Sequence, residues 1–287
     1  MTRIDGRDIA GRVLKELKRR PAPRKFLAAF MVGDDSASMS FLKQKEEVAA
    51  ELRVDFRLYR FPESVARDEL RRAIGAIARG GTCGGAIVQL PLPPHVNRRH
   101  ILNAIPELKD VDVLGERARE AFAAEMDGRA SGCLLPPAVG ALLEVLAAAG
   151  RELTAEARVV VLGRGFLVGE PVAKYFTNRT MLSVIDKGDD LAPVGAADLI
   201  VCGAGVPGLL TPEMLKEGAG VVDFGYGARA DGTISGDFDD STLKGGAERA
   251  GDGGLSGFYT PTPGGTGPIL VAKLMENFFK LAGDAET

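Results

Sequence analysis

Tryptophan is absent from the 287-residue chain, and histidine and cysteine are scarce, with two and three residues respectively. The cysteines, Cys83, Cys133 and Cys202, are odd in number and widely spaced, which argues against a disulfide framework and against a CxxC metal site. Because His95 and His100 are the only histidines, few residues could serve as zinc ligands or as the base of a Ser-His-Asp triad. The sequence therefore predicts no metal site.

The chain also lacks an excess of charge, since 36 basic and 39 acidic residues give a formal net charge of −3. With this balance the chain has no excess of positive charge that would attract nucleic acid or an anionic membrane. No apolar stretch approaches the roughly 18–20 residues that a membrane-spanning helix needs, and the N-terminal residues do not resemble a secretory signal. We expect a soluble cytoplasmic protein that binds neither nucleic acid nor a membrane.

Helical and strand patterns alternate along the whole chain. Apolar runs and alternating patterns predict strands at 26–32, 54–61, 85–89, 158–162, 181–186, 197–202 and 220–224. Apolar residues at helical spacing predict helices at 7–20, 37–52, 64–79, 137–149, 167–177 and 266–282. This alternation favours parallel sheet covered by helices on both faces, in about two domains. The glycine-rich, acidic segment 225–256 is expected to form mobile loops.

A glycine turn follows the predicted strand at 158–162. It reads Gly163-Arg164-Gly165-Phe166-Leu167-Val168-Gly169 and leads into a predicted helix. Such a turn lets backbone N–H groups and a helix N-terminus approach a pyrophosphate. The glycine spacing departs from GxGxxG, so a tight turn without a nucleotide is the alternative.

The next predicted strand ends in Asp186, 23 residues after Gly163. A carboxylate about 20 residues after the first glycine accepts from a ribose 2′-hydroxyl and repels a 2′-phosphate, which favours NAD. Arg164 in the turn offers a partner to a 2′-phosphate, which favours NADP. We predict an NAD(P) site with a weak preference for NAD.

Four further patches complete one pattern. They are Val32-Gly33-Asp34-Asp35-Ser36 with Phe41 and Lys45, Val88-Gln89-Leu90-Pro91-Leu92-Pro93, Lys109-Asp110-Val111-Asp112, and Thr262-Pro263-Gly264-Gly265-Thr266-Gly267-Pro268. Together with the glycine turn, these patches resemble the bifunctional methylenetetrahydrofolate dehydrogenase/cyclohydrolase (FolD) family. The resemblance runs from Ile4-Asp5-Gly6 to the final predicted helix.

The resemblance implies an α/β protein of two domains. Residues 1–135 and 265–287 would form an N-terminal, amino-acid-dehydrogenase-like, folate-binding catalytic domain, and 136–264 a Rossmann NAD(P)-binding domain. The final helix would return to the first domain, the folate would bind between the domains, and the protein would be a homodimer. The implied function, in one-carbon folate metabolism, is NAD(P)-dependent methylenetetrahydrofolate dehydrogenase with methenyltetrahydrofolate cyclohydrolase activity.

The resemblance also implies roles for single residues. Lys45 matches the family's catalytic lysine, Gln89 would hold that lysine, and Asp112 would accept from the N–H groups of the pterin. Phe41 lies one helical turn from Lys45. Pro263, Gly264 and Gly265 would let the backbone approach the folate and the nicotinamide. The nucleotide would contact Gly163, Arg164, Gly165, Val168, Gly169 and Asp186.

Several positions depart from the family pattern. Phe41 stands where tyrosine is usual, so the ring is kept and its hydroxyl is lost. Val113 replaces a glycine after Asp112, and because a β-branched residue disfavours positive φ, we expect a different local backbone. Gly165 replaces a serine of the turn. These changes favour hydride transfer over cyclohydrolase chemistry, since hydride transfer needs no protein acid or base.

Two alternatives follow from the same departures. One is a diverged NAD-linked oxidoreductase acting on another substrate. The other is a catalytically silent protein that binds folate or nucleotide.

Overall fold

The computed structural model describes residues 1–229, 232–243 and 257–283 and divides the chain into two compact units. The six-stranded unit comprises Met1–Gly11 and Ala138–Leu270, and the three-stranded unit comprises Arg12–Pro137 and Val271–Thr287. Both contain parallel sheet, which confirms the predicted two-domain α/β fold. Among the described residues, no helix is long and apolar enough to cross a membrane.

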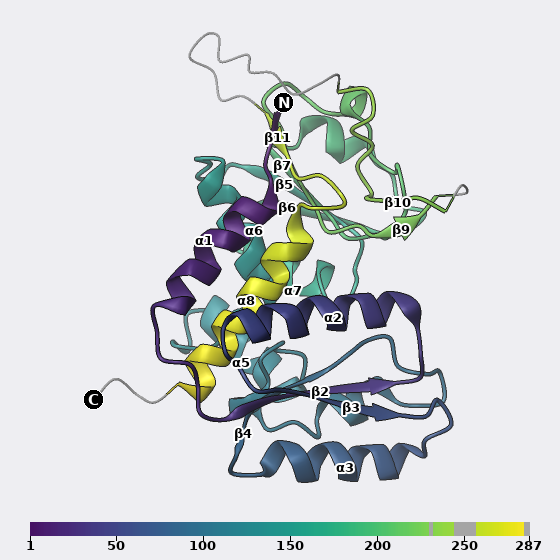
Figure 1. Cartoon of the computed structure of the whole chain (residues 1–287). Helices are drawn as coiled ribbons and strands as arrows, with labels where there is room; N and C mark the ends of the chain where they lie inside the picture. Colours follow the sequence, from purple (N-terminus) through teal and green to yellow (C-terminus); the bar gives the residue numbers. More distant parts are fainter. Residues whose placement is uncertain (230–231, 244–256, 284–287) are drawn as a thin grey trace. The chain divides into compact units, whose positions relative to one another are not determined.

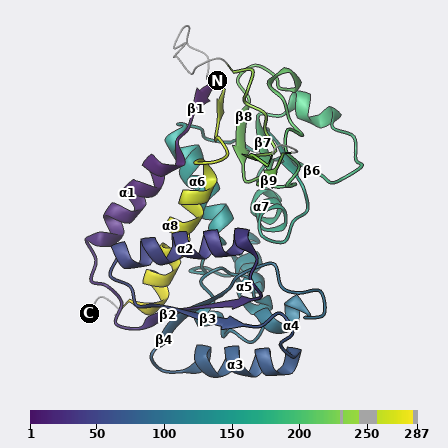
Figure 2. The ribbon, with the colours of Figure 1, turned by 45° about the vertical axis from the view of Figure 1, so that its right-hand side comes forward.

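The three-stranded unit is built around β2 (Phe26–Val32), whose seven residues are all buried. The parallel sheet has the order β3-β2-β4, with β3 at Phe56–Phe61 and β4 at Cys83–Val88. Helices α2 (Ser36–Glu51) and α3 (Arg67–Arg79) cover opposite faces of this sheet (Figures 1 and 2). Because side chains alternate along a strand, β2 supplies apolar groups to both helices.

The C-terminal helix α8 (Thr266–Ala282) completes the core on the α2 face of this sheet. Leu274, Met275 and Phe278 pack in one cluster with Leu27 of β2 and Leu42 of α2. The predicted return of the final helix to the first domain is therefore confirmed. Three shorter elements follow β4: α4 (Arg98–Leu102), the 3₁₀ turn η1 (Glu107–Lys109) and α5 (Glu116–Met126).

The six-stranded unit contains a fully parallel sheet with the order β1-β11-β8-β7-β5-β6. Its strands are β1 (Thr2–Arg3), β5 (Arg158–Leu162), β6 (Met181–Ile185), β7 (Leu199–Cys202), β8 (Gly220–Asp223) and β11 (Phe258–Tyr259). Helix α7 (Gly169–Phe176) connects β5 to β6, and the 3₁₀ turns η2 (Ala192–Ala196) and η3 (Pro212–Met214) lie between the next strands. Helix α6 (Pro137–Ala148) precedes β5, and α1 (Gly6–Lys18) follows β1 and runs from this unit into the other one. A buried apolar cluster that includes Val160, Ile200 and Val221 holds the strands together.

Two features of this unit differ from the sequence-based expectation. Residues 1–11 belong to it, whereas the ranges 1–135 and 265–287 placed them in the other domain, because β1 pairs in parallel with β11. The expected loop segment 225–256 contains a short antiparallel pair, β9 (Gly227–Ala228) and β10 (Ile234–Ser235). Residues 230–231 and 244–256 of that segment lie outside the described residues.

Candidate active site and nucleotide site

Helix α2 positions Phe41 and Lys45 on one face, one turn apart. The helix begins after Asp35, whose carboxylate accepts a 2.7 Å hydrogen bond from the backbone N–H of Ser38. Asp35 is therefore the N-cap of α2. The Ser38 hydroxyl donates to the Leu90 carbonyl over 3.4 Å and ties α2 to the segment after β4.

Gln89 holds the amine of Lys45. Lys45 Nζ donates to Gln89 Oε1 over 3.1 Å, and Gln89 Nε2 donates to the Leu90 carbonyl over 2.8 Å. The backbone N–H of Gln89 donates to the Phe30 carbonyl over 2.8 Å, just past the end of β4. Because the lysine amine is the donor, it meets the oxygen of the Gln89 amide, which is the amide's only acceptor. The structure thus brings together the lysine and the glutamine that the sequence had paired.

Asp112 and Lys45 influence each other's charge. Burial lowers the pKa of the Lys45 amine, and the negative charge of Asp112 opposes that change. Burial likewise raises the pKa of the Asp112 carboxyl, and the charge of Lys45 opposes it. A lysine with a lowered pKa is available as a proton acceptor at a higher fraction than a solvated lysine.

The segment around Asp112 is fixed on both sides. Asp110 is 3% exposed and its Oδ2 accepts from the backbone N–H groups of Leu114 at 3.0 Å and Gly115 at 2.6 Å. Burial raises the pKa of Asp110 to about 6. The Val111 carbonyl accepts from the side-chain amide of Asn277 in α8 over 2.9 Å. These contacts hold Asp112 from two directions.

Val113 adopts φ = +57°, although valine disfavours this region. The expectation that valine would avoid positive φ here was therefore wrong, because the turn holds a strained residue in the left-handed region. A left-handed conformation costs a non-glycine residue about 1–2 kcal/mol. The buried Val113 side chain and the hydrogen bonds to Asp110 hold the turn against that cost.

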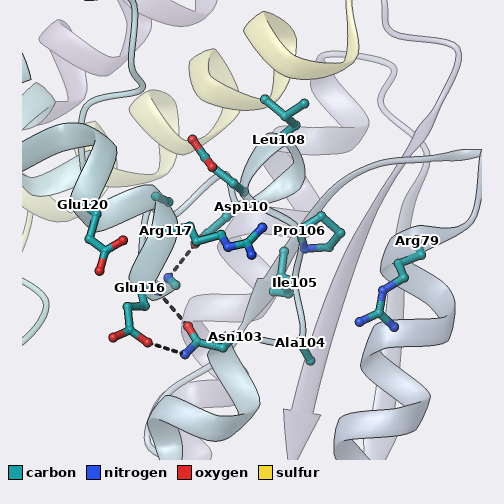
Figure 3. Close-up of a pocket in the computed structure, with 13 residues that line it drawn as sticks. Arg79, Asn103, Ala104, Ile105, Pro106, Leu108, Asp110, Glu116, Arg117 and Glu120 are labelled. Atoms are coloured by element: carbon teal, nitrogen blue, oxygen red, sulfur yellow. Dashed lines mark hydrogen bonds between the residues drawn. The ribbon is translucent and has the colours of Figure 1, made fainter. Parts of the chain in front are cut away.

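The three-stranded unit also contains a cavity of about 680 Å³, shown in Figure 3. It is lined by residues of α3, η1 and α5 and by the segment 103–106. Asn103 bonds both the backbone N–H and the carboxylate of Glu116 at its wall. Its lining includes two arginines and four acidic residues, and it includes neither Lys45, Gln89 nor Asp112. The cavity is therefore distinct from the lysine cluster.

The glycine turn of the six-stranded unit is explained by close packing. Gly163 has φ = +94°, and a Cβ added to Gly169 would lie 2.0 Å from the Gly163 carbonyl oxygen. Gly165 is not constrained in this way, since a Cβ there would meet only the Gly203 carbonyl oxygen at 3.6 Å. The turn follows β5, and α7 begins at Gly169 after Val168. This arrangement fits a pyrophosphate at a helix N-terminus.

The strand order places this turn at a topological switch point. From β5 the chain builds the sheet outward to β6 on one side and to β7 and β8 on the other. Dinucleotides bind outside the carboxyl ends of the strands at such a point. The fold and the turn therefore fit a nicotinamide dinucleotide.

Arg164 and Asp186, which had suggested opposite cofactors, lie next to each other. Arg164 Nε is 4.0 Å from Asp186 Oδ2, and Arg164 Nη2 donates to the Val184 carbonyl over 3.0 Å. Both side chains are half exposed, so their attraction is weak. A 2′-phosphate would need Arg164 as its partner, and Asp186 places a negative charge beside that arginine.

The Pro263-Gly264-Gly265 loop is packed against the start of the chain. Gly264 has φ = +96°, and its carbonyl accepts from the backbone N–H of Gly6 over 3.0 Å. A Cβ on Gly265 would lie 2.3 Å from the Pro261 carbonyl oxygen, and one on Gly6 would lie 1.6 Å from that of Gly265. Internal packing thus demands these glycines, and their contact with ligands stays a prediction.

Sequence reasoning missed two carboxylates of the six-stranded unit. Asp223 and Asp237 are 1% and 0% exposed. Burial raises the pKa of both, that of Asp223 to about 7 with a contribution from the charge of Asp237. For Asp223 the available indication was an acid at the end of the short apolar strand β8, whereas Asp237 follows only the two-residue strand β10 and carried no such indication. In the part of the chain that the structure describes, no group of three or more His, Cys, Asp or Glu is placed to hold a metal ion.

Comparison with known proteins places the chain in a family. The family model for the tetrahydrofolate dehydrogenase/cyclohydrolase catalytic domain matches residues 4–112, and that for its NAD(P)-binding domain matches residues 136–286. A bifunctional protein FolD of Desulforamulus reducens is 34% identical over 98% of this chain and 96% of its own length.

Two solved structures resemble the chain over nearly its full length. The bifunctional FolD of Campylobacter jejuni superposes with a TM-score of 0.86 at 30% identity, covering 98% of both chains. The FolD of Trypanosoma brucei, solved with NADP and an inhibitor, gives 0.84 at 29% identity, covering 97% of this chain and 96% of that one.

Two domains in this order, a lysine cluster in one and a nucleotide turn in the other, are the parts of a nicotinamide-dependent folate enzyme. The chain belongs to the tetrahydrofolate dehydrogenase/cyclohydrolase family, and its six-stranded unit contains most of the residues that match the family's NAD(P)-binding domain. The alternatives of another substrate or of a silent binding protein are not favoured, since the full-length relatives are bifunctional FolD proteins.

Proposed function

We propose that the protein oxidises 5,10-methylenetetrahydrofolate with NAD(P) and hydrolyses the resulting methenyl compound to 10-formyltetrahydrofolate. The contact between Lys45 Nζ and Gln89 Oε1, with the charge of Asp112 nearby, carries this proposal. It provides a lysine of lowered pKa in a fixed position, as hydration of a cationic carbon requires. The relative from Campylobacter jejuni is a methylenetetrahydrofolate dehydrogenase/cyclohydrolase, which supports the same reaction pair.

Lys45 would act in the hydrolytic step. Water adds to the methenyl carbon and loses a proton, and the bond from that carbon to N5 then breaks as N5 takes up a proton. The amine of Lys45, whose pKa is lowered by burial, would be the proton acceptor in its unprotonated form. Gln89 keeps the nitrogen in place through its carbonyl oxygen. Phe41 would supply a ring for stacking without a hydroxyl, so the glutamine takes a larger share of the positioning.

Asp112 would hold the substrate. Its carboxylate suits the amino and ring N–H donors of a pterin, and the rigid segment from Asp110 to Val113 fixes its direction. Pro263, Gly264 and Gly265 would contact the folate and the nicotinamide.

The six-stranded unit would hold the nucleotide. Bound NAD(P) supplies a hydride acceptor, and the chain's contribution is to bind and orient it. Gly163, Gly165, Val168 and Gly169 would surround the pyrophosphate, and Arg164 and Asp186 would contact the adenosine ribose.

We predict that Asp186→Ser raises the use of NADP relative to NAD. Removing the carboxylate frees Arg164 for a 2′-phosphate and removes a repulsion, so the ratio of kcat/KM for NADP to that for NAD should rise about tenfold. Initial rates with each nucleotide measure this ratio. Asp190→Ser, which removes a charge from the same exposed segment, is the control. An unchanged ratio in Asp186→Ser would show that Asp186 does not face the ribose.

A spectrophotometric assay tests the proposed function itself. The purified protein is mixed with 5,10-methylenetetrahydrofolate and NAD or NADP, and reduced nicotinamide and methenyltetrahydrofolate are followed together. We expect reduced nicotinamide without lasting build-up of the methenyl compound, since both steps proceed. Accumulation of the methenyl compound would contradict the cyclohydrolase step, and absence of reduction with either nucleotide would contradict the function as a whole.

The homodimer that the resemblance implies is also a proposal. Sedimentation equilibrium measures it, and a mass of one chain at micromolar concentration would contradict it.

A further inference from the structure

We propose that Asp237 is a positioning residue for nicotinamide-nucleotide binding, because its carboxylate fixes the 203–206 loop against the glycine turn. This inference rests on the proposed use of NAD(P). The 203–206 loop is the segment Gly203-Ala204-Gly205-Val206 that follows β7.

Asp237 binds three consecutive backbone N–H groups of the 203–206 loop. Its Oδ2 accepts from Ala204 at 2.7 Å and from Gly205 at 3.2 Å, and its Oδ1 accepts from Val206 at 2.6 Å. Hydrogen bonds to an ionised acceptor are shorter and stronger than neutral ones. Three such bonds from adjacent residues leave the loop backbone little freedom.

The 203–206 loop forms one wall of the switch point. β7 is the direct neighbour of β5, so the loop and the glycine turn leave the sheet side by side. A Cβ added to Gly163 would lie 2.8 Å from the Gly203 carbonyl oxygen and 3.0 Å from the Ala204 Cα. The two segments are therefore in contact, and a shift of the loop would move the wall facing the nucleotide.

Asp237 is itself held by β8 through Asp223. Asp223 Oδ2 accepts from the backbone N–H of Phe238 at 2.9 Å, and its Oδ1 accepts from Gly225 at 2.7 Å. The Asp223 carbonyl accepts from the Thr266 hydroxyl at 2.8 Å, just after the Pro263-Gly264-Gly265 loop. Hydrogen bonds thus link the 203–206 loop through Asp237 and Asp223 to Thr266, which follows the Pro263-Gly264-Gly265 loop.

The burial of Asp237 is costly, which argues for a specific use. Among the residues that the structure describes, no lysine or arginine forms an ion pair with it, and its hydrogen bonds come from backbone N–H groups. Gly225 is needed to admit it, since a Cβ there would lie 2.3 Å from the Asp237 Cγ. A neutral side chain would avoid the cost of burying charge but would not accept three N–H groups on two oxygens.

Asp237→Asn tests the proposal with little change in size. The amide has one accepting oxygen and places its NH2 against a backbone N–H, so the loop must shift. We expect the dissociation constant for NADH or NADPH, measured by titrating the fluorescence of the reduced nucleotide, to rise about tenfold or more. Asp239→Asn is the matched control, because Asp239 accepts from Ser241 and Arg229 in its own segment. An unchanged dissociation constant in folded Asp237→Asn would overturn the proposal.

Hydrogen exchange in the unliganded wild-type protein provides a measurement that does not depend on the variant. The amides of Ala204, Gly205 and Val206 should be protected before nucleotide is added, and unprotected amides would overturn the proposal. Neither measurement uses folate turnover. If the protein binds nucleotide but does not oxidise methylenetetrahydrofolate, the proposed function is contradicted. The role of Asp237 is still decided by nucleotide binding and hydrogen exchange.

Discussion

Replacing Lys45 with methionine should reduce conversion of methenyltetrahydrofolate to 10-formyltetrahydrofolate at least about 100-fold, the usual contribution of a positioned acid–base group. Methionine keeps the length and apolar stem of the side chain but offers no nitrogen to accept a proton or to bond Gln89. Hydride transfer needs position alone, so the dehydrogenase rate should stay within severalfold of wild type. Loss of absorbance of the methenyl compound measures the first activity, and formation of reduced nicotinamide measures the second.

Lys43→Met is the matched control for this experiment. Lys43 lies two residues away on α2, is largely exposed and forms a 3.8 Å surface pair with Glu47. Such a pair contributes little to stability. Both activities should survive in this variant. Equal loss of both activities in Lys45→Met would contradict the role of Lys45 in proton transfer.

Replacing Gly169 with alanine should have the opposite pattern, with dehydrogenase activity reduced about 100-fold or more and cyclohydrolase activity largely retained. The added Cβ would lie 2.0 Å from the Gly163 carbonyl oxygen and 3.0 Å from the Arg164 Cα, and backbone atoms cannot rotate away as a side chain can. The turn must open, and the start of α7 then no longer meets the pyrophosphate. Rates of both activities and the affinity for reduced nucleotide measure the effect.

Gly11→Ala supplies the comparison, because a Cβ at this helical position would meet nothing within 4 Å. Alanine is the better helix former, so this variant should keep both activities and gain slightly in stability. Full dehydrogenase activity in Gly169→Ala would show that the nucleotide does not depend on the closed turn. Loss of both activities would indicate general unfolding and would also contradict the prediction.

The sequence predicted the long elements well because the spacing of their apolar residues indicates which positions are buried. β2 is a continuous apolar run and was placed with the observed bounds, and α8 was likewise placed at 266–282. The two-residue strands β1 and β11 have no periodicity, since they exist only through their pairing with each other and with β8. Helix α5 was missed because only Ala118 and Phe122 of its eleven residues are buried.

The candidate site divides in the same way. Family motifs located Lys45 and Gln89, and the structure adds the hydrogen bond between them. The turn at Val113 could not be predicted, because intrinsic preference opposes the φ that its hydrogen-bonded surroundings impose. Asp237 could not be found, since its partners lie 31–33 residues earlier in the chain and are backbone groups of no particular residue type.

The interleaving of the two units constrains how the chain is made. The core of the three-stranded unit includes Leu274, Met275 and Phe278, while the sheet that they cover begins at Phe26. During synthesis, α2 can cover part of this face of the first sheet, but the apolar residues that α8 buries stay uncovered until nearly the whole chain has been made. Most multidomain proteins complete their N-terminal domain first. Here folding of that sheet finishes with the last helix, and a nascent chain halted before α8 would expose the apolar residues that α8 buries.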